Sequence, residues 1–285
     1  TPTNGEKSFS NEPHSDFSQT EVRKAMRASI GSVQALLGRK WHSGALGIRL
    51  TGPWLESRNP CRPSEVMARV QSAAVSDLDR VIEQALQQWD PWRQKAPQAR
   101  SEILRQAALE MSRRRYELAA WEIFEVGKPW READTDVAEA IDFLRYYADE
   151  MDRLARPVRL GNRPGELNQR TYAPRGVTVV IAPWNFPLAI PAGMVSAALV
   201  TGNPVLFKPS DRSPGLGTLL TDIFIEAGVP AGCLTCLPGG PEVGQALVAH
   251  SQVATIAFTG SKSVGLHILA EAARVSPGQP MVKRV

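Results

Sequence analysis

Four short apolar runs in the C-terminal part of the sequence alternate with four segments of helical character. The runs lack polar alternation, and each is followed closely by its helical segment. The apolar runs cover residues 177–182, 204–207, 233–237 and 255–258, and the helical segments cover 188–200, 216–227, 241–249 and 263–274. Strands that are apolar on both sides are buried on both faces, as in a parallel sheet covered by helices. The alternation therefore predicts a doubly wound, Rossmann-like α/β domain.

The chain before this alternation divides into three segments, and 175–285 carry the βα units. Residues 1–60 are rich in polar residues, Gly and Pro, and one amphipathic stretch, 19–37, predicts an N-terminal arm with a single helix. Residues 61–157 form a helical part of the domain, with helices predicted over 77–91, 97–127 and 134–154 and Pro91 ending the first. Residues 158–174 are broken by Gly, Pro and Asn, which predicts a hairpin or an excursion to a partner chain.

Composition and charge exclude several classes of function. With 43% hydrophobic and 22% charged residues among 285, the sequence is typical of a soluble globular protein with a sizeable core. The formal net charge of +4 comes without a long basic block, so no nucleic acid partner is expected. The densest basic run, Arg113-Arg114-Arg115, is interpreted as a solvated helix face. No apolar stretch approaches the roughly 20 residues of a membrane span and the first residues are polar, so we expect no membrane partner and a cytoplasmic location.

The cysteines and histidines suggest no site of their own. Three cysteines do not make a disulfide framework. Cys233 and Cys236 have the spacing of a redox or metal pair, but in a strand a separation of three places their side chains on opposite faces, which favours buried structural roles. The four histidines are scattered without ligand spacing, so no metal site is proposed.

The first apolar run ends in the turn Pro183-Trp184-Asn185-Phe186-Pro187. Doubly wound folds place their ligand sites in such strand-to-helix turns, at the carboxyl edge of the sheet. Prolines fix their own φ and restrict the residue before them, so the Asn185 amide can be held as a donor to a developing oxyanion. The alternative is an Asn with a purely structural role in a tight turn.

The second apolar run ends at Lys208, which is followed by Pro209, Ser210 and Asp211. Neither G-x-G-x-x-G nor G-x-x-x-x-G-K-S/T occurs, so neither of the usual phosphate fingerprints supports a nucleotide site. At the carboxyl edge of the sheet, the Lys208 ammonium would donate to ribose hydroxyls or phosphate, and Asp211 would accept from a ribose hydroxyl. The alternative for Lys208 is a solvated side chain beside a turn.

Small residues follow the third and fourth apolar runs. Gly239-Gly240 and Gly244 permit close backbone approach by a ligand or by a neighbouring helix. The segment 258–261, Phe-Thr-Gly-Ser, opens a helix that contains Val264. Its free N–H groups and the Ser261 hydroxyl suit a pyrophosphate, and they suit an ordinary helix cap equally well.

These turns together resemble those of the aldehyde dehydrogenase superfamily. The resemblance rests on 183–187, 208–210, 238–240 and 258–261 in this order and spacing, and it covers residues 60–285. Segments 11–18, 127–130 and 132–147 are similar to those of the L-glutamate γ-semialdehyde (1-pyrroline-5-carboxylate) dehydrogenases. That activity occurs alone or as the second half of the bifunctional proline utilisation A proteins.

The resemblance implies the fold of an NAD-binding domain and an NAD-dependent oxidation of an aldehyde to an acid. The implied substrate is L-glutamate γ-semialdehyde, oxidised to L-glutamate in proline degradation. In this family a cysteine thiolate attacks the aldehyde, hydride passes to the nicotinamide, and a glutamate activates water to hydrolyse the thioester. By matching motifs, Asn185 is the oxyanion donor and Phe186 borders the aldehyde channel. The cofactor-binding residues implied in the same way are Ile181, Pro183, Trp184, Lys208, Ser210, Asp211, Gly240, Gly244, Phe258, Thr259, Gly260, Ser261 and Val264.

Two departures from the family pattern qualify this expectation. Asp211 stands where the family usually has Glu, although an acid there should still disfavour the phosphate of NADP by repulsion. The nucleophilic Cys and the general-base Glu belong to segments beyond 258–261 that this sequence does not contain, and Glu271 is interpreted as an exposed helical residue. With Thr1 first and Val285 last, we expect an N-terminal fragment that lacks the catalytic domain and is inactive alone.

Two alternatives to this function stay open at the level of sequence. Among enzymes, an aldehyde dehydrogenase of another specificity is the alternative, because the loop that would anchor the substrate lies outside the sequence. Outside enzymes, the alternative is a non-catalytic NAD-binding or assembly protein. The resemblance also implies that the full-length protein forms a homo-oligomer through a hairpin that 158–174 begins.

Overall fold

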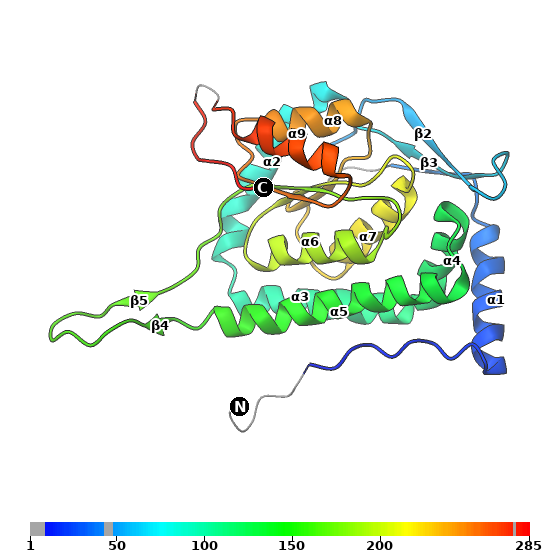
Figure 1. Cartoon of the computed structure of the whole chain (residues 1–285), viewed down its shortest axis with the longest axis horizontal. Coiled ribbons are helices and arrows are strands. Elements are labelled where there is room, and N and C mark those ends of the chain that lie inside the picture. The colour runs from blue at the N-terminus through cyan, green and yellow to red at the C-terminus, as the bar shows by residue number, and fades with distance from the viewer. Residues whose placement is uncertain (1–8, 43–47, 276–277) are drawn as a thin grey trace.

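The computed structural model describes residues 9–42, 48–275 and 278–285, and a parallel sheet lies at the centre of the fold (Figure 1). Its four strands are β6 (Thr178–Ile181), β7 (Val205–Lys208), β8 (Leu234–Cys236) and β9 (Thr255–Phe258), in the order β8-β7-β6-β9. All three pairings are parallel. The four predicted strands and the predicted sheet type are therefore confirmed, with ends that differ by at most one residue.

Helices cover both faces of this sheet, as expected for a doubly wound fold. On one face lie α6 (Ala189–Val200) and α7 (Pro214–Glu226), and on the other lie α2 (Leu78–Gln94), α8 (Pro241–Ala249) and α9 (Lys262–Ala272) (Figure 1). Alternate strand residues enter the two cores: Val180 and Phe207 pack toward α6 and α7, whereas Val179 and Leu206 pack toward α2 and α8. This period of two explains why the strands are apolar throughout.

A layer of three helices packs outside α6 and α7. It consists of α3 (Pro97–Arg113), α4 (Arg115–Val126) and α5 (Trp130–Leu154), with α3 and α5 side by side (Figure 1). The single helix predicted over 97–127 is wrong, because Arg114 leaves helical geometry (φ −95°, ψ 15°) and divides it in two. The third helix begins four residues earlier than predicted, directly after Pro129, whose extended backbone precedes its first turn.

The expectation that Pro91 ends a helix is also wrong. Helix α2 continues past it to Gln94. Proline removes one backbone donor but does not forbid a further turn when tertiary contacts stabilise it. Trp92 provides that contact: it is buried, and its Nε1 donates a 3.0 Å hydrogen bond to the Leu199 carbonyl of α6.

The N-terminal part contains the predicted helix, α1 (Thr20–Gln34), and a small sheet that the sequence pattern did not reveal. The sheet consists of β1 (Arg39–Trp41), β2 (Trp54–Arg58) and β3 (Val66–Gln71), ordered β1-β3-β2, and is followed by the short 3₁₀ helix η1 (Val75–Asp77). Strand β1 has only three residues and β2 is largely exposed, so neither carries an apolar run, whereas β3 is six residues long and mostly buried.

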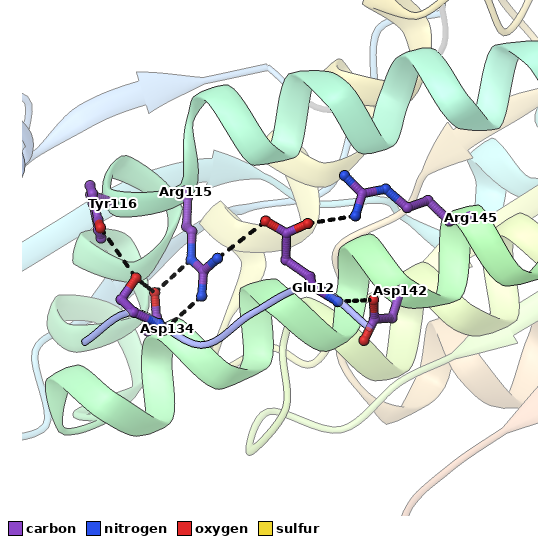
Figure 2. A network of polar contacts seen from close by, with 7 residues as sticks. Glu12, Arg115, Tyr116, Asp134, Asp142 and Arg145 are labelled. Atoms are coloured by element: carbon purple, nitrogen blue, oxygen red, sulfur yellow. Dashed lines mark hydrogen bonds and ion pairs between the residues drawn. The ribbon is translucent and has the colours of Figure 1, made fainter. Parts of the chain in front are cut away.

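An extended segment before α1 is attached to the helical layer by charged side chains (Figure 2). Glu12 forms ion pairs with Arg115 of α4 and Arg145 of α5. Arg115 also binds Asp134 of α5 through two contacts, at 2.6 and 2.8 Å. The interpretation of 113–115 as a solvated helix face is therefore wrong for Arg115, which is 11% exposed, and for Arg114, which pairs with Glu117 and Glu226.

Two further predictions are confirmed. Within 158–174, β4 (Val158–Arg159) and β5 (Gln169–Arg170) pair antiparallel in a hairpin that projects from the body of the fold (Figure 1). Cys233 and Cys236 are both buried. Across the described ranges, no helix combines the length and apolarity that a membrane crossing requires.

Candidate functional site

Three of the predicted motifs meet at the carboxyl edge of the central sheet. Ile181, at the end of β6, pairs in register with Lys208 of β7 on one side and with Phe258 of β9 on the other. The chain order of the strands reverses at β6, because β7 and β8 extend to one side and β9 to the other. This reversal is where ligands bind in open α/β sheets.

A cavity of about 460 Å³ opens at this edge, between β6, β7, α8 and α9. Half of its polar and glycine lining was predicted from sequence. The predicted residues that line it are Ile181, Lys208, Asp211, Gly240, Gly244 and Val264. The sequence signals at the ends of separate strands therefore converge in one cavity.

Lys208 is the central charged group of this cavity. It is only 8% exposed, and its Nζ donates to the Pro209 carbonyl at 3.2 Å. Burial lowers the pKa of Lys208, while the carboxylates of Asp211 and Glu242 act in the opposite direction. A solvated lysine beside a turn is therefore not what the structure contains.

The cavity has the features that a dinucleotide requires. A buried ammonium, an acidic group on the neighbouring turn and glycine backbone at the wall are the donors, acceptors and clearance used for ribose and phosphate. Gly244 lies against the Lys208 side chain, so that a Cβ there would stand 3.4 Å from Lys208 Cδ. The residues present fit the adenosine half of NAD.

The segment 258–261 makes contacts within the chain around the cavity. The Ser261 hydroxyl accepts from the Val264 N–H at 3.4 Å and caps α9, while Gly260 leaves room for the Phe258 ring. Thr259 faces a different cavity and donates to the sulfur of Met194 at 3.7 Å. Ser210 accepts from the Arg212 N–H and contacts Asp211, outside the cavity lining.

The turn around Asn185 borders a second cavity, of about 480 Å³, on the side of the helical layer. Trp184, Asn185 and Phe186 are all exposed there, and Pro183 is half-buried. Arg212 lies over the Trp184 ring at 5.6 Å, and Lys128 Nζ lies 4.3 Å from the centre of the Phe186 ring. Asn185, Phe186 and Trp184 thus line this cavity together, and Trp184, which does not line the Lys208 cavity, shares a smaller cavity with Asp211.

Several lining residues were not predicted. His267, Ile268 and Glu271 line the Lys208 cavity from α9, and the other unpredicted lining residues are Pro241, Gln245, Val248 and Ser263. Their signal was helical spacing, because 264, 267, 268 and 271 share one face. Glu271 is half-buried rather than exposed, and it pairs with Arg274 at 2.9 Å.

Comparison with known proteins agrees with this geometry. A family model described as "Aldehyde dehydrogenase family" matches residues 51–282. The chain belongs to the aldehyde dehydrogenase family. The match contains the central sheet, the helical layer and both cavities, and the predicted fold of the family's NAD-binding half is confirmed.

Within the family, the chain is similar to 1-pyrroline-5-carboxylate dehydrogenases. It is 44% identical over 279 residues to the enzyme of that name from Geobacillus thermodenitrificans, which covers 97% of this chain and 54% of the relative. A Thermus 1-pyrroline-5-carboxylate dehydrogenase with bound NAD superimposes with a TM-score of 0.94 at 41% identity, covering 98% of this chain and 55% of that one. Proline utilisation A from Bdellovibrio bacteriovorus gives a TM-score of 0.95 at 42% identity over 100% of this chain and 30% of that protein. The chain therefore spans about half the length of the curated relatives it matches.

Proposed function

We propose that this chain is the N-terminal, NAD-binding part of a dehydrogenase that oxidises L-glutamate γ-semialdehyde to L-glutamate. The observation that carries this proposal is the cavity at the switch point of the sheet, in which Lys208, Asp211, Gly240 and Gly244 meet. The similarity to 1-pyrroline-5-carboxylate dehydrogenases, which extends over 97% of the chain, supports the choice of substrate.

Each residue of the site has a part that follows from its chemistry. Lys208 would donate to a ribose hydroxyl, and Asp211 would accept from one while repelling a 2′-phosphate. Bound NAD supplies the hydride acceptor. The Asn185 amide, exposed beside Phe186, would donate to the oxygen of the aldehyde as negative charge develops on it.

Catalysis in this proposal requires a nucleophile and a base from outside the 285 residues. None of the three cysteines is suited to be the nucleophile beside Asn185. Cys233 and Cys236 are buried thiols, and burial raises the pKa of Cys233 to about 12. Cys61 is exposed but outside both cavities. We therefore expect the 285-residue chain to bind NAD without oxidising aldehydes.

The test is to read the gene on both sides of this segment and to assay its complete product. NADH production with 1-pyrroline-5-carboxylate, much faster than with benzaldehyde or short aliphatic aldehydes, supports the proposal. A complete product that binds NAD but oxidises none of these aldehydes overturns it in favour of a cofactor-binding or assembly role. A preference for another aldehyde overturns only the substrate.

We also propose that the full protein is a homo-oligomer that associates through the β4–β5 hairpin. The hairpin projects from the fold (Figure 1), and it carries apolar side chains that are exposed in the single chain. These are Val158, Leu160, Leu167 and Tyr172. Sedimentation of the complete product with Leu160 and Leu167 both changed to Ser should give a smaller species than the unaltered protein.

A further inference from the structure

A cluster of buried charges lies beneath the turn that carries Asn185. It consists of Glu122 on α4, Lys128 in the connection to α5, and Asp136 on α5. Lys128 Nζ lies 2.6 Å from Asp136 Oδ2 and 3.0 Å from Glu122 Oε2. The carboxylates are fully buried and the lysine side chain is 9% exposed.

This cluster contacts the turn on both sides of Asn185. Asp136 Oδ1 accepts a 2.9 Å hydrogen bond from the N–H of Ala189, the first residue of α6. Lys128 Nζ lies 4.3 Å from the centre of the Phe186 ring, within the range of a cation–π contact. The neighbour of Asn185 and the helix that follows it are thus both held by one buried ion pair.

Two acidic groups at the cluster, Glu122 and Glu139, have raised pKa values. Burial raises the pKa of Glu122 well above its ordinary value, and repulsion from Asp136 adds to this against the effect of Lys128. Glu139, the other acidic group facing the cluster from α5, has its pKa raised by burial and by Asp136. Lys128 Nζ lies closer to Asp136 than to Glu122, at 2.6 against 3.0 Å, and Asp136 is also the carboxylate that contacts α6.

A buried ion pair of this kind contributes little to the free energy of folding. Burying an ion pair costs desolvation free energy that apolar side chains of similar volume would not require. Its benefit is geometric, because a charged acceptor and a cation fix the direction of the groups they contact. The groups contacted here are Ala189 and Phe186, which flank Asn185.

We propose that Asp136 and Lys128 are positioning residues for Asn185: together they hold the turn 185–189 so that the Asn185 amide points into its cavity. This inference rests on the proposed role of Asn185 as the donor to the aldehyde oxygen. Neither residue touches the reacting atoms. Both act through the backbone of α6 and the ring of Phe186.

The first test is amide hydrogen exchange of the 285-residue chain, resolved by residue with NMR. Asp136→Ala removes the acceptor of the Ala189 N–H, so exchange at 185–189 should accelerate about 10- to 100-fold, as for the loss of a hydrogen bond to a charged group. Asp134→Ala is the matched control, since Asp134 is equally buried on α5 but binds Arg115 and Ser15. It lowers overall stability but keeps the acceptor of the Ala189 N–H, so it should accelerate exchange at 185–189 far less than Asp136→Ala.

A second variant tests the same proposal in case Asp136→Ala does not fold. Lys128→Met keeps the aliphatic stem and removes only the cation, and it should accelerate exchange at Phe186 and Asn185 by about tenfold or more. Equal exchange at 185–189 in all variants overturns the proposal. Equal acceleration in the Asp136 and Asp134 variants overturns it as well, because the effect is then general loss of stability.

Kinetics of the complete gene product separate this inference from the proposed function. Asp136→Asn should lower kcat for the aldehyde about 10- to 100-fold and leave the KM for NAD within a factor of two, since the Lys208 cavity is unaffected. An equal loss in kcat for Asp134→Asn overturns positioning by Asp136. If the unaltered product oxidises no aldehyde, the proposed function fails, and the exchange experiment alone still decides whether Asp136 holds the turn.

Discussion

The side chain of Lys208 lies against Gly244 of α8, so that a Cβ at position 244 would stand 3.4 Å from Lys208 Cδ and 3.5 Å from Cε. The absence of a side chain at Gly244 thus leaves the space that the Lys208 side chain occupies beside the cavity. A larger residue would meet the lysine stem rather than open solvent. Because Lys208 is buried, its stem has little room to move aside.

Gly244→Val should therefore weaken NAD binding through Lys208. The branched side chain would displace the lysine stem, and we expect the dissociation constant for NAD to rise about tenfold, with an overpacking cost of roughly 1–3 kcal/mol in stability. Isothermal titration calorimetry measures the affinity. Gly31→Ala is the control, because a Cβ there meets nothing within 4 Å, and it should leave the affinity unchanged. An unaltered affinity in Gly244→Val would show that Lys208 does not bind the cofactor.

Substitution of Ser261 distinguishes a helix cap from a pyrophosphate ligand. Ser261→Ala should lower the free energy of unfolding by about 1 kcal/mol, because the acceptor of the Val264 N–H is lost. Ser261→Asp retains a capping acceptor and adds a negative charge. It should preserve stability and raise the dissociation constant for NAD about tenfold or more if phosphate oxygens approach this helix end. Unchanged NAD affinity in the Asp variant would leave Ser261 as a cap alone.

Arg115→Met should be strongly destabilising, whereas Arg113→Met should not. Loss of Arg115 leaves Asp134, only 1% exposed, without its buried partner, at an expected cost of about 3–5 kcal/mol. Arg113 is 67% exposed, and its removal should change the free energy of unfolding by about 0.5 kcal/mol at most. Urea denaturation of the two variants measures this difference. Similar costs for both would contradict the structural role assigned to Arg115.

Glu125 should make stability depend on pH. Its two oxygens accept from the N–H groups of Gly215 and Leu216 at 2.9 and 2.8 Å, and burial raises its pKa from 4.5 to about 7. The folded state holds this proton more tightly than the unfolded state, so the contribution is full below pH 4.5 and is lost as the pH rises through about 7.

The loss expected from Glu125 is about 3 kcal/mol, from roughly 1.4 kcal/mol for each unit of pKa. Glu125→Gln removes the titration, so the free energy of unfolding of this variant should fall less between pH 4.5 and pH 8 than that of the unaltered chain. Urea denaturation at the two pH values measures both. If the free energy of unfolding falls equally in the two proteins, the pH dependence comes from a group other than Glu125.

Much of the fold and of the Lys208 cavity could be predicted from the sequence. Apolar runs of strand length, each followed by a helix, imply a parallel sheet, and the carboxyl ends of parallel strands share one edge. Lys208 is thereby predicted at this edge, at the end of its strand. Gly240 and Val264 are assigned to the same site by the resemblance of their motifs to the family, so pattern and topology carry the first prediction and motif resemblance carries the second.

The tertiary structure alone decided which charged residues are buried and which helices continue. Arg115 is buried because Glu12, 103 residues away in sequence, and Asp134 pair with it. The Asn185 turn is held by Asp136, whose Oδ1 accepts from the N–H of Ala189, 53 residues away in sequence. Sequence pattern reports the local preference of a segment, whereas the cost of a buried charge is offset only by partners that folding brings together.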